Sequence, residues 1–400
     1  MKKVVLAFSG GLDTSYCAVY LSRELGYEVH TLTVNTGGFS KEELSDIEAR
    51  ALRLGVKSHR AVDETRNYYD QVIRYLIYGN VLKNSTYPLS VSAERMSQAL
   101  ATAKYAREIS ASAVAHGSTG AGNDQVRFDM TLQILAPGLE IITPIRDKRL
   151  SREAEIEYLK SNGIDYNAAK AAYSINKGLW GTSVGGRETL KSLGMLPEEA
   201  WPTPVTKSNP EEAILGFEKG ELLSVDGKKF NHPTEAIVYL QAKAGPFGIG
   251  RDIHVGDTII GIKGRVGFEA AAPVIIIKAH HALEKHVLTK WQLSWKDQLA
   301  QFYGNWLHEG QYLDPIMRDM EAFLTSSQRH VTGTVSLTLA PHRFVINGIE
   351  SPYDLMSAKF GKYGEMNLGW TGEDVKGFTK IFGNQVAIYH QVEEEARSTN

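Results

Sequence analysis

The feature that most constrains the fold is a regular alternation of strand-like and helix-like segments over residues 1–165. Apolar runs typical of buried strands occur at residues 4–8, 28–34, 57–62, 113–116 and 140–143. Between them lie helix signals, such as residues 14–25 and the capping box that Ser40 and Glu43 form. This order predicts a doubly wound α/β domain, in which helices cover both faces of a parallel sheet. Ligands of such sheets bind beyond the carboxyl ends of the strands.

The pattern changes after residue 165. Four prolines lie close together and predict a long connecting loop: Pro197, Pro202, Pro204 and Pro210. Lys219-Gly220 and Asp226-Gly227 each follow a short apolar run and predict hairpin turns. Residues 331–339 alternate like a half-exposed strand, and residues 373–382 are typical of a helix. We therefore expect a second, α+β domain over residues 166–370 and a helical tail over residues 371–400.

Composition excludes several classes of protein. The 400 residues carry a formal net charge of −2 without a basic run, which argues against a nucleic-acid partner. The single cysteine, Cys17, allows no internal disulfide, and we interpret it as a buried apolar residue. The longest apolar run, residues 270–277, is far shorter than the ~20 residues of a membrane span. We expect a cytoplasmic protein without a membrane partner. His280, His281 and His286 lack metal-pair spacing and indicate a polar helix face.

The most informative local motif lies between the first predicted strand and the first predicted helix. It reads Ser9-Gly10-Gly11-Leu12-Asp13-Thr14-Ser15. Its glycines allow a tight turn, and the following helix offers unpaired N–H groups, so the motif is suited to bind phosphate. It is not a Walker A loop, because the Gly-Lys-Ser/Thr ending is missing. It resembles the loop of pyrophosphate-loop ATP enzymes, which cleave ATP between the α and β phosphates.

A second glycine-rich motif follows the strand predicted at residues 113–116 and spans residues 116–128. Asn123 or Asp124 is placed to cap the next helix, and Arg127 lies about one turn later on the same side as Asp124. A carboxylate and a guanidinium on one helix face are suited to bind an ammonium and a carboxylate group, as an amino acid presents them. The other interpretation is an ion pair on a solvated surface.

With this second motif the chain strongly resembles argininosuccinate synthases, whose signature includes H-G-x-T-G-x-G-N-D-Q-V-R-F. The resemblance continues at residues 173–183, 248–251, 331–335 and 351–353, and so covers nearly the whole chain. It implies an ATP-dependent carbon–nitrogen ligase of arginine biosynthesis with an N-terminal ATP pyrophosphatase-type domain. The ureido oxygen of citrulline would attack the α-phosphate of Mg-ATP, giving citrullyl-AMP and pyrophosphate, and the amine of aspartate would then displace AMP.

The resemblance also implies roles for individual residues. ATP would contact Ala7, Phe8, Ser9, Gly10, Gly11, Leu12, Asp13, Thr14, Ser15, Val34 and Gly117. Aspartate would contact Thr119, Asn123 and Asp124. Citrulline would contact Tyr87, Ser92, Asn123, Arg127, Ser174 and Ser183. We expect Asp13, Asp124 and Arg127 to be the catalytic residues, and Mg²⁺ to be held by phosphates rather than by protein ligands. Family members are typically homotetramers in which the C-terminal segment packs on other subunits.

Some positions depart from the family pattern: Val34, Gly38, Val91 (at a position assigned to aspartate), Ala121, Gly256 and Phe268. Gly256 and Phe268 align with a Glu and a Tyr that contact citrulline in the family, so both changes remove polar groups from one substrate site. One hypothesis is that the ureido substrate is an N-acylated citrulline, which has no free α-ammonium for a carboxylate to bind. The other is that Asp257 or Glu269 replaces the missing acid.

Two other functions are compatible with parts of this sequence. The chain is compatible with another adenylating ligase of the same loop family, either amide-forming or tRNA-modifying. A non-catalytic nucleotide-binding module would need only the first motif, so the second motif argues against it.

Overall fold

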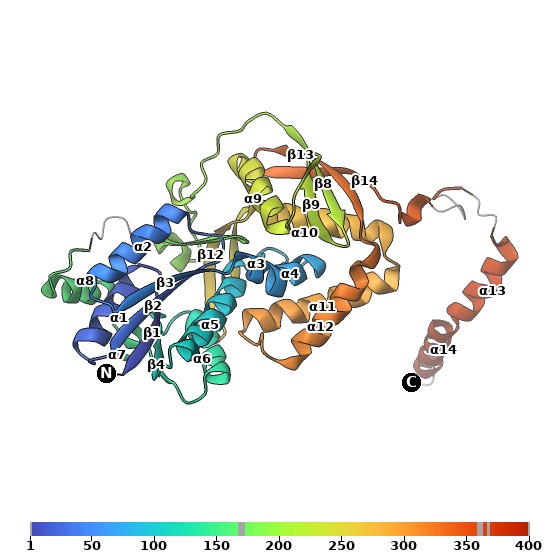
Figure 1. Ribbon diagram of the computed structural model, residues 1–400. Coiled ribbons are helices and arrows are strands. Elements are labelled where there is room, and N and C mark those ends of the chain that lie inside the picture. The colour runs from blue at the N-terminus through green and yellow to red at the C-terminus, as the bar shows by residue number, and fades with distance from the viewer. Residues whose placement is uncertain (1, 167–172, 358–362, 366–368, 399–400) are drawn as a thin grey trace. The chain divides into compact units, whose positions relative to one another are not determined.

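The first five strands form one parallel sheet in the computed structural model, which describes residues 2–166, 173–357, 363–365 and 369–398 (Figure 1). The strands are β1 (Lys3–Ala7), β2 (Glu28–Asn35), β3 (Ser58–Asp63), β4 (Ala113–Ala115) and β5 (Glu140–Ile142). Their order in the sheet is β3-β2-β1-β4-β5, and every neighbouring pair is parallel. The predicted parallel sheet is confirmed. Because the order reverses between β1 and β4, the loops that follow these two strands meet at one edge.

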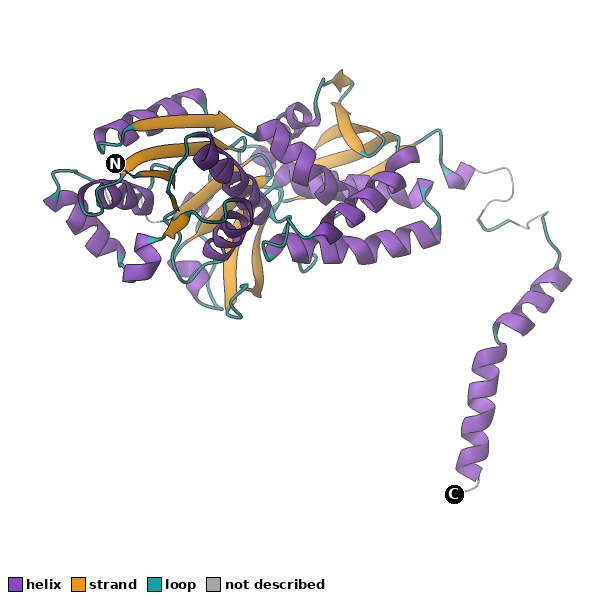
Figure 2. Ribbon diagram, turned by 60° about the horizontal axis from the view of Figure 1, so that its bottom comes forward, coloured by secondary structure: helices purple, strands orange, loops and turns teal. Residues whose placement is uncertain are grey.

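Helices cover both faces of this sheet (Figures 1 and 2). They are α1 (Leu12–Arg23), α2 (Lys41–Arg53), α5 (Ser90–Glu108), α6 (Asp124–Leu135), α7 (Pro144–Lys148) and α8 (Arg152–Ser161). Val4 and Leu6 of β1 pack in one hydrophobic cluster with residues of α1, α2 and α8. Val5 points to the opposite face and packs with residues of α5 and α6. The doubly wound arrangement is therefore confirmed, and Cys17 is fully buried on α1 as expected.

The chain from Met1 to Pro352 forms one compact unit, and the part of it that follows the parallel sheet holds two antiparallel sheets. One has the order β10-β9-β8-β13-β14 and the other β11-β12-β7-β6. Their strands are β6 (Ser174–Gly178), β7 (Gly181–Gly185), β8 (Glu211–Glu218), β9 (Glu221–Val225), β10 (Lys228–Lys229), β11 (Arg251–Asp257), β12 (Lys263–Glu269), β13 (Gly333–Ala340) and β14 (Arg343–Glu350). The helices are α3 (Thr65–Tyr68), α4 (Arg74–Tyr78), α9 (Pro233–Ala244), α10 (Ala271–Val287), α11 (Lys290–His308) and α12 (Pro315–Ser327). The expected α+β character is confirmed.

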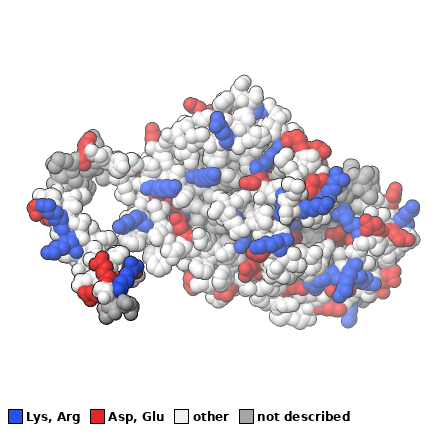
Figure 3. Space-filling model, turned by 180° about the vertical axis from the view of Figure 1, so that it is seen from behind, with Lys and Arg blue, Asp and Glu red and all other residues white. Residues whose placement is uncertain are grey.

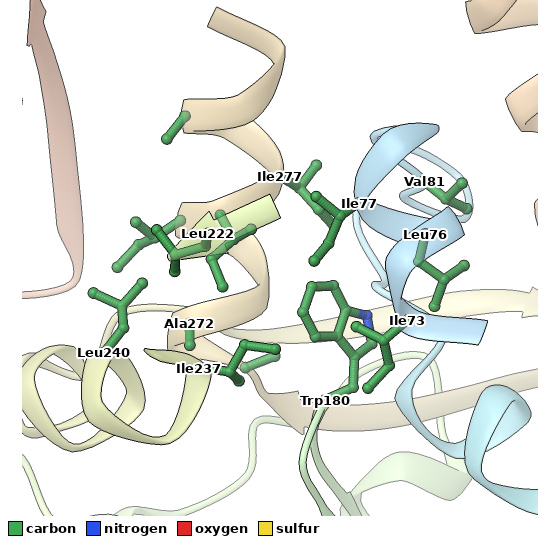
Figure 4. Packing of buried hydrophobic residues seen from close by; sticks show 14 of the residues in the cluster. Ile73, Leu76, Ile77, Val81, Trp180, Leu222, Ile237, Leu240, Ala272 and Ile277 are labelled. Atoms are coloured by element: carbon green, nitrogen blue, oxygen red, sulfur yellow. The ribbon is translucent and has the colours of Figure 1, made fainter. Parts of the chain in front are cut away.

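A large hydrophobic cluster joins these helices and sheets. Trp180 points into it beside Ile73 and Ile77 (Figure 4), and its indole Nε1 donates a hydrogen bond of 2.9 Å to the carbonyl oxygen of Pro88. The bond satisfies the one polar group of a fully buried indole. Because Pro88 lies two residues before α5, the bond ties the start of that helix to the core.

Short-range predictions for this part of the chain also hold. The turns at Lys219-Gly220 and Asp226-Gly227 join β8 to β9 and β9 to β10, and all four residues have positive φ. The proline-rich stretch contains one short 3₁₀ turn, Glu198–Ala200, and is otherwise a loop.

Tyr353–Asn400 form a separate compact unit. Within it lie α13 (Gly372–Phe382) and α14 (Asn384–Ser398), so the expected helical tail is confirmed. Among the described residues no helix is both long and apolar enough to cross a lipid bilayer. On the face shown in Figure 3, Lys and Arg side chains are interspersed with Asp and Glu.

Candidate active site

The predicted phosphate-binding motif from Ser9 to Ser15, called the phosphate loop below, follows the end of β1, as expected. Gly10 has φ +74°, a conformation that favours glycine. Helix α1 starts at Leu12, two residues earlier than expected, because Gly11 takes the N-cap position. Gly11 offers no side-chain cap, so the N–H groups of the first helical turn remain available for an anion. The hydroxyl groups of Ser9 and Thr14 lie 3.3 Å apart beside them.

The loop after β4 approaches the phosphate loop closely. A Cβ atom on Gly117 would lie 3.2 Å from the Cβ of Asp13, so only glycine fits there without displacement. Val34, another predicted ATP contact, lies one residue before the end of β2, and its side chain packs in the hydrophobic cluster with α5 and α6. It therefore has only its backbone to offer to a ligand.

Asp124 and Arg127 form the predicted pair at the start of α6. Asp124 Oδ1 accepts a hydrogen bond of 3.0 Å from Arg127 Nη1, and Asp124 Oδ2 accepts one of 2.9 Å from Arg95 Nε on α5. Burial by itself would raise the pKa of the Asp124 carboxyl. The two guanidinium groups outweigh burial and hold that pKa below its usual range. Asp124 is thus a carboxylate at neutral pH.

Arg127 is 2% exposed, which excludes the solvated surface pair. Its Nε and Nη2 donate to the carbonyl oxygen of His308 at 3.0 and 2.8 Å, and Nη2 also donates to Ser92 Oγ at 2.9 Å. Burial lowers the pKa of Arg127, and the charge of Asp124 opposes that effect. The predicted residues Ser92, Asp124 and Arg127 therefore form one connected network, to which His308 adds a second contact with Ser92.

Asn123 lies at the N-cap of α6, but its side chain does not cap the helix. The prediction of a side-chain cap there is wrong. The Oδ1 atom of Asn123 instead accepts a hydrogen bond of 2.8 Å from the backbone N–H of Ile259, in the turn between β11 and β12. Asn123 thus connects the parallel-sheet domain to the antiparallel sheet. Thr119, the other predicted aspartate contact in this loop, is exposed.

Tyr87, Phe268 and His254 form a buried aromatic group. The Tyr87 ring centroid lies 5.3 Å from that of Phe268 and 5.1 Å from that of His254. The Tyr87 hydroxyl accepts the backbone N–H of Val91 at 3.1 Å. A Cβ on Gly256 would lie 2.6 Å from His254 Nε2, so the imidazole occupies the space next to this glycine. Burial lowers the pKa of His254, which keeps the imidazole neutral.

The two predicted serines lie on neighbouring strands of the antiparallel sheet. Ser183 on β7 is the register partner of Phe268, and Ser174 on β6 pairs with Gly185. Asn176 Nδ2 donates to Ser183 Oγ at 3.4 Å, while its Oδ1 accepts from Arg95 Nη2 at 2.7 Å. Arg95 therefore connects this strand to Asp124.

A polar pocket of about 280 Å³ lies beside the network and shares His308 with it. It is lined by Lys83, Asn84, Asp257, Thr258, Ile259, Asn305, His308 and Glu309. Of the two acids suggested as replacements, Asp257 lines this pocket and is ion-paired with Lys263 at 2.6 Å. Glu269 is buried and bonded to Thr203 and Arg251 instead. Asp257 is therefore the better placed of these two acids.

Comparison with known proteins agrees with this geometry. The model of the arginosuccinate synthase N-terminal HUP domain matches residues 3–165, and that of the C-terminal domain matches residues 173–389. The chain belongs to the argininosuccinate synthase family. The argininosuccinate synthase of Methanocaldococcus jannaschii is 37% identical over 96% of this chain and 97% of its own length. That of Xanthomonas campestris pv. campestris is 38% identical over 98% and 99%. The resemblance inferred from the two glycine-rich motifs is confirmed.

Four side chains that contact the predicted site residues were not predicted from the sequence: Arg95, Asn176, His254 and His308. Arg95 lies one helical turn after Ser92 on α5, a spacing that offered a signal. His308 ends α11, more than 180 positions from Arg127 in the sequence, and no local pattern connects them.

Proposed function

We propose that this chain joins citrulline to aspartate with ATP, giving argininosuccinate, AMP and pyrophosphate in arginine biosynthesis. The observation that carries this proposal is the meeting of two sites at the ends of β1 and β4. There Gly117, in the loop after β4, approaches Asp13 of the phosphate loop, and the next helix, α6, carries the Asp124–Arg127 ion pair with its buried guanidinium. The membership of this chain in a family of carbon–nitrogen ligases supports the same reaction.

In the proposed mechanism the loop from Ser9 to Ser15 holds the phosphates, and the ureido oxygen attacks the α-phosphorus. Pyrophosphate leaves, and the amine of aspartate then attacks the ureido carbon of citrullyl-AMP and releases AMP. Asp124 binds the aspartate ammonium, and Arg127 with Ser92 positions the ureido substrate. The protein contributes alignment and electrostatic stabilisation, without a covalent intermediate on its own side chains.

Mg²⁺ fits this site through the phosphates. Among the described residues no group of three or more His, Cys, Asp or Glu side chains is placed to hold a metal. The ion, when bound with ATP, would neutralise phosphate charge, and the N–H groups at the start of α1 would hold the same phosphates.

Omitting one substrate at a time tests the reaction against its rivals. We expect AMP formation from ATP to require citrulline, and turnover to the condensed product to require aspartate as well. An amide-forming or tRNA-modifying ligase would form AMP without citrulline. A nucleotide-binding module would bind ATP without consuming it.

A second candidate substrate is an N-acylated citrulline. It is favoured by the uncharged side chains of Phe268 and His254 and by the glycine at 256, because the family has a Glu and a Tyr at positions 256 and 268. An amide nitrogen carries no charge and needs no carboxylate partner, whereas a free α-ammonium does. Asp257 in the adjacent pocket favours free citrulline, although Lys263 already neutralises part of its charge.

Side-by-side kcat/KM values for citrulline, N-acetylcitrulline and N-succinylcitrulline decide between the two substrates. A clear preference for free citrulline would end the N-acyl hypothesis. If the hypothesis holds, Gly256→Glu with Phe268→Tyr should shift the preference toward citrulline. A glutamate at 256 meets the His254 imidazole, so we expect the full shift only when His254→Ala is added. His254→Ala alone is the control.

We also infer that the enzyme works in the cytoplasm as a homotetramer. In this proposal residues 1–165 bind the nucleotide, residues 166–370 form the synthetase domain and residues 371–400 pack on neighbouring subunits. Exposed apolar side chains on α13 and α14 support that last role, among them Phe378, Ile381 and Tyr389.

A further inference from the structure

Two carboxyl groups lie together behind the phosphate loop. Asp13 is the second residue of α1, and Glu155 projects from α8, which packs against α1. The Glu155 residue is only 2% exposed, and its carboxyl group forms a side-chain hydrogen bond with that of Asp13. Two carboxyl groups can share a hydrogen bond only when one of them carries a proton. The Oε2 atom of Glu155 is buried and has no partner within the described part of the chain.

The surroundings of this pair favour its protonated form. Burial raises the pKa of Glu155 to about 8, and the charge of Asp13 and the shared hydrogen bond act in the same direction. The opposing cation is Arg152, on the same helix. From α1, Tyr16 and Cys17 also face the pair, and the pKa of each is raised, chiefly by burial, so both are neutral.

The neighbouring helix α7 brings one cation to this region. Its Lys148 ammonium lies 4.5 Å from the ring centroid of Tyr20, and α7 also packs against α1. Lys148 thus contacts an aromatic ring of α1 and is not among the charges that act on the Glu155 carboxyl. Glu155 is therefore uncharged below about pH 8 and gains a negative charge above it.

We propose that Glu155 is a positioning residue of the phosphate loop: it shares one proton with Asp13, so that the loop meets the ATP phosphates with one negative charge fewer. The inference rests on the proposed function, because it requires that ATP phosphates occupy the loop. The shared proton also fixes the direction of the Asp13 side chain, beside which Gly117 of the other loop leaves little room for a Cβ atom.

The proposal makes ATP binding depend on pH with a definite sign. A raised pKa means that the proton is present below about pH 8 and is lost above it. If ATP binds only the protonated pair, its affinity should fall by about tenfold for each pH unit above that value. Above pH 8 the triphosphate is already fully ionised, so ionisation of ATP itself does not change the affinity with pH.

The test is the affinity of the full chain for ATP with a methylene group between the α and β phosphates, measured from pH 7 to 9.5. We expect the unmodified chain to lose affinity above pH 8, by about tenfold per unit. Glu155→Gln keeps a hydrogen-bond donor for Asp13 but cannot ionise, so its affinity should stay flat. Glu157→Gln, an exposed acid on the same helix, should behave like the unmodified chain. A flat profile for the unmodified chain, or an equal slope in Glu155→Gln, would overturn the proposal.

A second measurement needs no substitution and so holds even when Glu155→Gln folds poorly. Calorimetric titration in two buffers of different ionisation enthalpy should show nearly one proton taken up per analogue bound at pH 9, and almost none at pH 7. Binding without proton uptake at pH 9 would contradict the shared proton while leaving ATP binding established. Absence of binding at every pH would instead overturn the proposed function, and this inference with it.

Discussion

Asp124 is the single residue on which recognition of aspartate depends most in this account. Its carboxylate is shared between Arg95 and Arg127, so its position and charge are both fixed. Asp124→Asn keeps the shape and removes the charge. Loss of a charged hydrogen-bond partner costs about 1.5–3 kcal/mol, so we expect kcat/KM for aspartate to fall by about one to two decades. The KM for ATP should change little, and an unchanged aspartate dependence would count against the assignment.

Arg127 makes a different prediction because its guanidinium is almost fully buried. A lysine at this position cannot donate from two nitrogens to the His308 carbonyl and still reach Ser92 and Asp124. For Arg127→Lys we expect KM for the ureido substrate to rise by at least about tenfold, with KM for ATP nearly unchanged. Steady-state kinetics with each substrate varied in turn would show it. Equal effects on both KM values would indicate general damage to the fold.

The same residues show which contacts of the candidate site could be predicted from the sequence. The pair Asp124 and Arg127 was predictable because one helical turn separates its members. The contact of His308 was not, because α11 meets α6 only through long-range packing, and Arg95 was indicated only by its spacing from Ser92 on α5. Likewise, the sequence shows that Gly256 lacks a polar side chain, but not that His254 from the same strand occupies the space beside it.

At the scale of elements, local signals predicted most boundaries. The capping box is present, with Ser40 Oγ accepting the Glu43 N–H at 3.1 Å and Glu43 Oε2 accepting the Ser40 N–H at 2.8 Å. The interpretation of the α10 histidines as a polar face is wrong for His280, which is fully buried and bonded to Asn80 and Gln328. Helical spacing cannot show that a buried network from other elements surrounds one position.

That network makes a stability prediction for α10 and α11. Lys296 and Glu284 are fully buried and form an ion pair of 2.9 Å. Lys296→Met would leave the carboxylate without its cation, so the free energy of unfolding should fall by about 3–5 kcal/mol. Lys290→Met, at an exposed position of α11, is the control and should stay within about 0.5 kcal/mol of the unmodified chain. Urea unfolding measures both, and equal effects would show that the pair adds nothing.

At the scale of the whole molecule, the parallel sheet was predictable. For the antiparallel sheets, only their presence in an α+β domain was predictable, and their strand order was not. A parallel sheet follows from the strand–helix repeat, and its connections are right-handed almost by rule. The pairing of β12 with β7 joins residues about 85 positions apart, and no turn motif in the sequence predicts such a pairing. The same long-range pairing places Phe268 opposite Ser183 in the candidate site.

The C-terminal unit gives a prediction about assembly. Its helices expose the apolar side chains of Val375, Phe378, Ile381, Phe382 and Val386, and exposed apolar patches mark interaction surfaces. Removing Tyr353–Asn400 should therefore convert a tetramer into smaller species. Light scattering of the shortened and full chains measures the change, and a tetramer that survives the deletion would contradict the proposed role of the tail.

The central claim is that this chain cleaves ATP between the α and β phosphates to activate a ureido oxygen. Product analysis with purified enzyme, ATP, aspartate and a ureido substrate is the decisive test. Citrulline, N-acetylcitrulline and N-succinylcitrulline should be assayed in parallel. We expect AMP and pyrophosphate in equal amounts, with ¹⁸O from a labelled ureido group recovered in AMP. Stoichiometric ADP and phosphate, or AMP without the label, would contradict the account.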